Sequence, residues 1–127
     1  MGAHHPMALG AVQNKELIYK MGLEVAKDFK RVGMHMNLAP DVDVNNNAKN
    51  PVINYRSFGE NKYNVTDKAG AYLRGMQDGG LLVSIKHYPG HGDTDVDSHY
   101  DLPQLKFTKE RLDSLEMYPF KELIKQG

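Results

Sequence analysis

Several features are missing from the sequence, and each absence narrows the possible functions. It contains no cysteine, so disulfide bonds and thiolate metal sites are excluded. Its sixteen basic and sixteen acidic residues cancel, and nothing in their distribution indicates binding to nucleic acid or an anionic membrane. No apolar run approaches the roughly 20 residues of a spanning helix, and residues 1–10 lack the apolar core of a signal peptide. We therefore expect a soluble chain, cytoplasmic or periplasmic, without a nucleic-acid or membrane partner.

The 127 residues fit one domain, without an internal repeat, low-complexity tract or linker. Apolar residues recur every three or four positions in two stretches, which predicts amphipathic helices near 15–32 and 65–78. Gly33 is the expected end of the first helix, and Asn64 or Thr66 is the expected cap of the second. Gly79 and Gly80 are expected to end that second helix.

The remaining segments predict two strands and a third helix. The strands are expected near 34–39 and 81–86, each bounded by turn-forming residues. The third helix is expected near 109–125, with Thr108 as its cap and Pro119 as a break or restart. The order helix, strand, helix, strand, helix is typical of parallel strands joined by crossover helices, as in a doubly wound sheet or a barrel.

Two strands are too few for a complete parallel sheet, so the chain corresponds to part of a larger α/β fold. The polar loops 45–64 and 87–107 both follow the C-terminal ends of strands, where α/β folds place their ligands. The second loop belongs to the most unusual segment of the chain. Residues 86–99, KHYPGHGDTDVDSH, contain three histidines and three aspartates.

A metal site is one explanation of that cluster. An extended backbone would place alternate residues of the loop on one side: His91, Asp93, Asp95, Asp97 and His99. The proline and glycines at 89, 90 and 92 favour an irregular turn instead, and no helical or EF-hand metal spacing is present. We therefore expect no metal and no cofactor. A plain polar turn explains the acidic residues at 93 and 95, but three imidazoles exceed what a turn needs.

A proton-handling loop is the third explanation, and it centres on Asp97 and His99. An aspartate two residues before a histidine can accept the imidazole Nδ1 hydrogen, and the ring can then act as acid in one step and base in the next. Lys86 ends its strand on the same side as Ser84, so it is expected to point toward a polar site, with a buried ion pair as the alternative. A purely structural role is the alternative for His87.

Three motifs, in order, give the chain a family resemblance. KHYPGHGDTDVDSH resembles the K-H-F-P-G-H-G-x-T-x-x-D-S-H loop of the glycoside hydrolase family 3 catalytic domain, in its β-N-acetylhexosaminidase branch. NLAPDVDV, residues 37–44, resembles the family's F-A-P-x-x-D-V strand, and NYRSFGE, residues 54–60, resembles its R-S-[FY]-G-x loop. The resemblance runs from about Met7 to the end of the chain, so residues 1–127 are interpreted as a fragment of the family's N-terminal barrel domain.

The resemblance implies a (β/α)8 barrel, of which this chain contains about two to three βα units. It also implies hydrolysis with retention through a glycosyl-enzyme intermediate on an aspartate. In this branch the acid/base is a histidine paired with an aspartate, which places those roles on His99 and Asp97. The substrate is then expected to be a β-glycoside, in particular an N-acetylglucosaminide.

The resemblance further implies contacts with sugar hydroxyls from Arg56, Lys86 and His87. Asp43 matches the family's strand-end aspartate and is interpreted as a structural partner of Arg56. His91 belongs to the motif and is expected to hold the loop by hydrogen bonds.

The chain also departs from the family pattern. The nucleophilic aspartate belongs to a later barrel strand, so residues 1–127 alone are expected to be inactive and to need the remainder of the barrel or to self-associate. Asp41 replaces an apolar residue, so its strand is expected to be less buried than usual. A family 3 β-glucosidase, a glycoside phosphorylase and a non-catalytic carbohydrate-binding fragment remain as alternatives.

Overall fold

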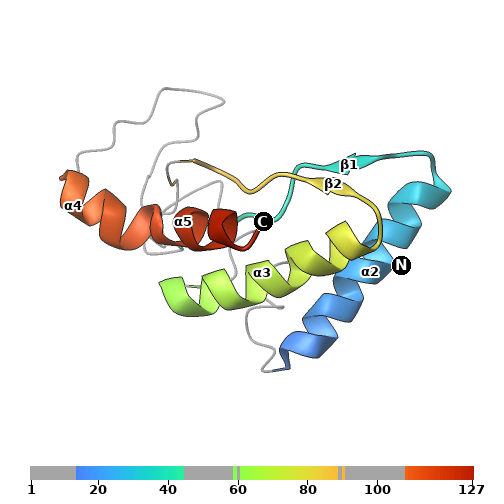
Figure 1. Ribbon diagram of the computed structural model, residues 1–127, viewed down its shortest axis with the longest axis horizontal. Helices are drawn as coiled ribbons and strands as arrows, with labels where there is room; N and C mark the ends of the chain where they lie inside the picture. Colours follow the sequence, from blue (N-terminus) through green and yellow to red (C-terminus); the bar gives the residue numbers. More distant parts are fainter. Residues whose placement is uncertain (1–13, 45–58, 60, 89, 91–107) are drawn as a thin grey trace.

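The computed structural model describes residues 14–44, 59, 61–88, 90 and 108–127. In Figure 1 the two strands lie along one side of the molecule, and helix α3 (Lys62–Asp78) runs beneath them. Helix α3 packs against α2 (Lys15–Arg31) and against α5 (Tyr118–Lys125). No helix in these described ranges is both long and apolar enough to cross a membrane.

Helix α2 begins and ends close to the expected residues. The side-chain oxygen of Asn14 accepts hydrogen bonds from the backbone N–H groups of Glu16 and Leu17, at 3.0 and 3.4 Å, which satisfies donors that have no partner within the helix. The helix closes at Val32, and Gly33 follows with φ of 80°, a conformation that glycine adopts without strain. The expected stop at this glycine is confirmed.

Helix α3 begins three residues earlier than expected, and neither of the two expected caps is correct. Asn61 is the cap: its side chain accepts from the backbone N–H groups of Tyr63 and Asn64 at 2.9 and 3.1 Å. Thr66 lies within the helix and donates its hydroxyl to the carbonyl of Lys62 at 2.7 Å. The helix ends at the two glycines 79 and 80, as expected.

Helices α2 and α3 approach each other closely at two glycines. A Cβ atom on Gly75 would lie 2.1 Å from the carbonyl oxygen of Tyr19, and one on Gly22 would lie 2.4 Å from that of Tyr72. Neither distance is compatible with a side chain, so the close approach of the two backbones requires glycine at both positions. The Tyr19 hydroxyl also donates to Asp78 Oδ2 at 2.5 Å, which ties the two helices together at their surface.

Strands β1 (Met36–Asn37) and β2 (Leu82–Val83) pair in parallel, which confirms their expected relation. The regular ladder is short: the next bond beyond it runs from the N–H of Ser84 to the carbonyl of Ala39 at 3.3 Å, two residues past the end of β1. The contact nevertheless continues: Lys86 donates its N–H to the Pro40 carbonyl at 3.2 Å, and Val42 donates to the Lys86 carbonyl at 2.8 Å. The two segments of the chain therefore run side by side as far as residues 42 and 86.

The C-terminal helix is not continuous. Thr108 caps α4 (Lys109–Arg111) as expected, a π-helical turn η2 (Leu112–Glu116) follows, and α5 starts anew. The cause is Pro119 in the first turn of α5, because its ring would clash with a carbonyl four residues earlier in an unbroken α-helix. The predicted break or restart at this proline is confirmed. The main apolar core lies between α3, α5 and the chain after β1: Val42, Val44, Val65, Ala69, Phe120 and Leu123.

Candidate functional site

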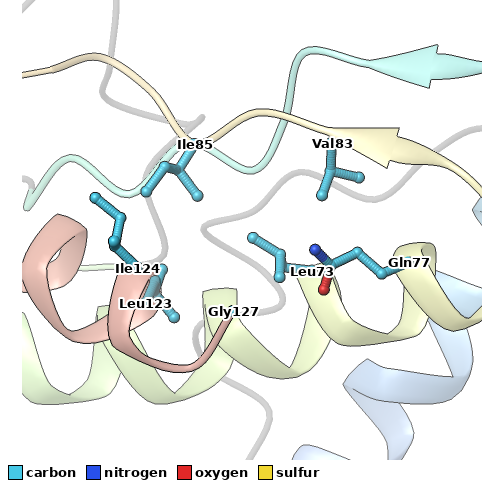
Figure 2. A pocket seen from close by; sticks show the side chains of 7 residues that line it. All are labelled: Leu73, Gln77, Val83, Ile85, Leu123, Ile124 and Gly127. Carbon is cyan, nitrogen blue, oxygen red and sulfur yellow. The ribbon is translucent and has the colours of Figure 1, made fainter.

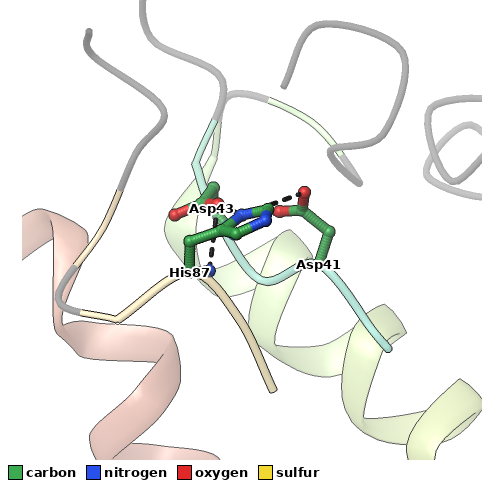
Figure 3. Close-up of side chains that lie close together, drawn as sticks. All are labelled: Asp41, Asp43 and His87. Carbon is green, nitrogen blue, oxygen red and sulfur yellow. Dashed lines mark hydrogen bonds and ion pairs between the residues drawn. The ribbon is translucent and has the colours of Figure 1, made fainter. Parts of the chain in front are cut away.

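Two aspartates and a histidine converge where the paired strands end. Figure 3 shows Asp41 and Asp43 on either side of the imidazole of His87. The Nδ1 atom of His87 lies 2.7 Å from Asp43 Oδ2 and 3.6 Å from Asp41 Oδ2. The backbone N–H of His87 donates to the same Oδ2 atom of Asp43 at 3.1 Å. We call these three residues the strand-end cluster.

The local sequence explains this convergence. In an extended segment, alternate residues point to opposite sides. Val42 and Val44 are buried in the core, so Asp41 and Asp43 point away from it, toward the second strand. Asp41 Oδ1 also accepts the backbone N–H of Asp43 at 3.0 Å, which holds the turn between the two carboxylates.

Burial differs sharply between the members of the strand-end cluster. The side chains of Asp41 and Asp43 are 3% and 0% exposed, whereas that of His87 is 32% exposed. A ring that donates its Nδ1 hydrogen to Asp43 presents Nε2 as an acceptor, because the hydrogen bond fixes the tautomer. The carboxylates are thus the buried support, and the imidazole is the part of the cluster that reaches accessible space.

Gly90 lies against the π-helical turn η2. Gly90 has φ of 140°, and a Cβ atom there would lie 2.4 Å from Cβ of Glu116. Glu116 is 2% exposed and accepts from Arg111 Nη2 at 3.3 Å through Oε1. Residue 90 must therefore be glycine for the chain to follow this path out of the second strand.

The structure brings together only part of the expected site. Asp43 and His87 are in contact, and Lys86 is next to them, half-buried, opposite Asp41 in an isolated parallel bridge. Four expected site residues lie outside the described residues: Arg56, His91, Asp97 and His99. The expected contact between Asp43 and Arg56 therefore stays a prediction.

The burial of Asp41 differs from what its sequence position predicted. Its strand was expected to be less buried than usual, but the side chain is 3% exposed. The carboxylate tolerates burial because it accepts the Asp43 N–H and faces an imidazole that becomes a cation when protonated. The available signal was the two-residue spacing from Asp43, which puts both side chains on one side of an extended chain.

An apolar depression lies on the helix side of the second strand. Figure 2 shows Val83 and Ile85 facing Leu73 of α3 and Leu123 and Ile124 of α5 across it. Alternate residues of this strand therefore turn toward the helices, in agreement with the expectation that its polar residues turn the other way. The depression offers apolar contact rather than groups for chemistry.

Parallel strands, crossover helices and polar residues at the strand ends define a segment of an α/β barrel or of a related parallel fold. The family description "Glycosyl hydrolase family 3 N terminal domain" matches residues 3–127. The chain belongs to this family, and its fold is part of an α/β barrel.

Named relatives agree with this membership. The chain is 42% identical over 122 residues to "Beta-hexosaminidase A" of Pseudoalteromonas piscicida, covering 94% of this chain and 20% of that protein. A solved family 3 β-N-acetylglucosaminidase from a Paenibacillus species is 44% identical, with a TM-score of 0.93, over 96% of this chain and 23% of that one. A solved β-glucoside phosphorylase, BglX, is 27% identical with a TM-score of 0.93, over 98% and 22%.

The chain thus spans about a fifth to a quarter of the length of these relatives.

Proposed function

We propose that this chain supplies part of the sugar-binding and acid/base machinery of a retaining β-N-acetylhexosaminidase. The observation that carries the proposal is the strand-end cluster, in which two buried carboxylates support the accessible imidazole of His87 at the start of the segment KHYPGHGDTDVDSH. Similarity to the two hexosaminidase relatives supports the substrate class, a β-linked N-acetylglucosaminide.

His87 contacts a sugar hydroxyl in this proposal. Its Nδ1 hydrogen is held by Asp43 at 2.7 Å, so Nε2 accepts a hydrogen bond from the hydroxyl in one fixed direction. Such preorganisation matters because a sugar hydroxyl bound in a fixed place costs less reorganisation when the ring distorts toward its transition state. Lys86 and Arg56 bind neighbouring hydroxyls, and His91 holds the loop.

Asp97 and His99 perform the proton transfers. The imidazolium of His99 donates a proton to the departing glycosidic oxygen while an aspartate outside these 127 residues attacks the anomeric carbon. The neutral imidazole then removes a proton from the incoming water, whose oxygen displaces the aspartate and restores the original anomeric configuration. Asp97 accepts the ring's other N–H hydrogen and stabilises the positive charge in the first step.

A second candidate is a glycoside phosphorylase, and the similarity to BglX favours keeping it. A histidine acid/base, unlike a carboxylate, does not repel an incoming phosphate anion. In that reaction phosphate replaces water and the product is a sugar phosphate. A family 3 β-glucosidase differs only in the sugar, and a non-catalytic fragment would bind sugar without turnover.

A direct test uses a complete family barrel that contains this sequence, supplied with aryl N-acetyl-β-glucosaminide or aryl β-glucoside, with and without inorganic phosphate. The proposal predicts faster release of the aryl group from the N-acetylated substrate, no acceleration by phosphate, and a first-formed product of β configuration by NMR. A sugar phosphate as the main product would establish the phosphorylase instead, and an α product would contradict retention.

Residues 1–127 alone are proposed to lack turnover, because they supply no nucleophilic aspartate for the covalent step, and to self-associate or bind the remaining barrel segments. Release of the aryl group by the purified chain that disappears on His99→Ala would contradict this. A strictly monomeric chain in light scattering at high concentration would contradict the self-association.

A further inference from the structure

We propose that Glu116 is a positioning residue for the acid/base, because its buried side chain fixes the start of the segment that carries Asp97 and His99. Glu116 does not touch the substrate in this proposal and acts only through residues 87–99. The inference rests on the proposed function, in which His99 transfers the protons. It adds to that function a residue from the C-terminal part of the chain.

Glu116 is an unusual residue for the interior of this chain. Its side chain is 2% exposed, and its Oε1 atom accepts a hydrogen bond from Arg111 Nη2 at 3.3 Å. The other oxygen, Oε2, is also buried and accepts no hydrogen bond from the residues that the structure describes. A buried acceptor without a donor costs free energy, and glutamine or leucine would fill the same space without burying a charge. Packing alone therefore does not explain a glutamate here.

The π-helical turn η2 directs Glu116 into the interior. In this turn Met117 donates its N–H to the carbonyl of Leu112, five residues earlier, at 2.8 Å. Such a turn contains one residue more than an α-helical turn, which shifts the direction of the side chains at its end by about 100°. Asp113 in the same turn is 39% exposed, whereas Glu116 is buried. Turns of this kind occur frequently at functional sites.

The interior neighbour of Glu116 is Gly90, the fifth residue of the segment KHYPGHGDTDVDSH. A Cβ atom on Gly90 would lie 2.4 Å from Cβ and 2.9 Å from Cγ of Glu116, so the backbone of residue 90 packs directly against this side chain. Two residues earlier, the ring of Tyr88 contacts that of Phe120 edge-on, with the centroids 5.6 Å apart. The start of the segment is thus held by η2 and α5 as well as by the paired strands.

The position of Gly90 affects proton transfer because Asp97 and His99 follow it in the same segment. A general acid must lie within hydrogen-bond distance of the atom that it protonates, and a displacement of about 1 Å can lower the rate about 100-fold. Gly90 has no side chain of its own to hold it, so its place depends on the surface against which it packs. Glu116 supplies that surface, and Arg111 holds the carboxylate. The Oε2 atom is a further acceptor that N–H groups of the segment can use.

Steady-state kinetics test this role in a complete family barrel that contains this sequence, with aryl N-acetyl-β-glucosaminides of poor and good leaving groups. Glu116→Gln keeps the size of the side chain but removes its charge, which weakens the bond from Arg111. We expect kcat/KM for the poor leaving group to fall about 10–100-fold, which is part of the loss expected when a proton donor is removed. The good leaving group needs less protonation and should be affected less. Glu122→Gln makes the same change on α5 and is expected to leave kcat/KM unchanged.

A double-mutant cycle with His99→Ala separates positioning from a general loss of packing. If Glu116 acts through His99, Glu116→Gln has almost no further effect on kcat/KM once residue 99 is alanine, because residues that act as one unit are not additive. A general loss of packing lowers kcat/KM by the same factor in both backgrounds. Equal factors in the two backgrounds, or a wild-type kcat/KM for Glu116→Gln, would overturn the proposal.

Arg111→Gln is a second variant that covers a failure of Glu116→Gln to fold. The Arg111 side chain is 41% exposed, so its replacement disturbs the interior less, and it removes the donor to Glu116 Oε1. The same dependence on the leaving group and on His99 is expected, and its absence would overturn the proposal.

The outcomes also separate this proposal from the proposed function. If His99→Ala keeps the wild-type kcat/KM, the acid/base assignment and the positioning role both fail. If His99→Ala loses activity but Glu116→Gln and Arg111→Gln do not, only the positioning role of Glu116 is overturned.

Discussion

The helix pair α2–α3 and the strand-end cluster are both tightly packed, but different forces shape them. The helix pair is set by shape: Gly22 and Gly75 allow the backbones to approach until a single added carbon would clash. The cluster is set by hydrogen bonds and charge, with Asp43 buried against His87 at 2.7 Å. Changes in the first region should therefore alter stability, and changes in the second should alter chemistry.

The largest expected effect is a loss of turnover when the proposed acid/base is removed. In a complete family barrel that contains this sequence, His99→Ala removes the proposed acid/base and should lower turnover about 10²–10⁴-fold, as for loss of a positioned proton donor. Substrates with good leaving groups should suffer less in the first step. Steady-state kinetics on activated and natural substrates checks this, and wild-type rates on both would show that His99 is not the acid/base.

A smaller chemical effect is expected for Asp43→Asn. The change weakens a hydrogen bond to a carboxylate, worth about 1.5–3 kcal/mol, so kcat/KM should fall about 10–100-fold. The imidazole stays in place but loses the acceptor that fixes its tautomer. An unchanged kcat/KM would mean that the orientation of His87 does not matter for the reaction.

The structural side of the comparison is tested by Gly75→Ala. The new Cβ would lie 2.1 Å from the Tyr19 carbonyl oxygen, so the helices must move apart, at a cost of about 1–3 kcal/mol. Urea unfolding measures this loss, and Lys27→Ala on the exposed side of α2 is a control expected to stay within about 0.5 kcal/mol of wild type. Equal stability of the two variants would contradict the close contact of α2 and α3.

The smallest expected effect is a change in the pH dependence of stability at the surface of the helix pair. The hydrogen bond to Asp78, with smaller contributions from desolvation and the nearby negative charge, raises the pKa of Tyr19 above its usual value of 10.0. The folded state thus holds this proton more tightly, and the resulting stabilisation is present below pH 10 and lost as the pH rises through the folded-state pKa. Tyr19→Phe should remove this alkaline loss, as urea unfolding across that range would show; an unchanged alkaline profile would mean that the bond contributes nothing.

The sequence predicted the elements better than the details of their ends. Spacing of apolar residues identified the first two helical regions, and Thr108 and Pro119 marked the third, because all of these signals are local. The start of α3 was misplaced because Asn61, Asn64 and Thr66 are all acceptable caps, and only the path of the chain selects among them. The shift to a π-helical turn before α5 depends on how the chain accommodates Pro119, which apolar spacing does not encode.

In the candidate site, too, local features could be predicted from the sequence, whereas contacts between distant residues could not. Motifs identified Asp43 and His87 as site residues, since both are fixed by short sequence patterns. Their contact joins residues 44 positions apart, so it depends on the parallel pairing of two strands. The burial of Asp41 was predicted wrongly because an acidic residue at an apolar position normally indicates exposure. Its burial is explained only by neighbours such as His87 on the second strand, which the sequence around Asp41 does not reveal.

The central claim is that the strand-end cluster serves sugar chemistry while the helix pair serves stability. The most direct measurement is kcat/KM for an aryl N-acetyl-β-glucosaminide, together with the free energy of unfolding, in a complete family barrel carrying either His87→Ala or Gly75→Ala. We predict that His87→Ala lowers kcat/KM and leaves most of the free energy of unfolding intact, whereas Gly75→Ala lowers the free energy of unfolding and leaves the kcat/KM of the folded enzyme unchanged. A His87→Ala variant with wild-type kcat/KM would contradict the account.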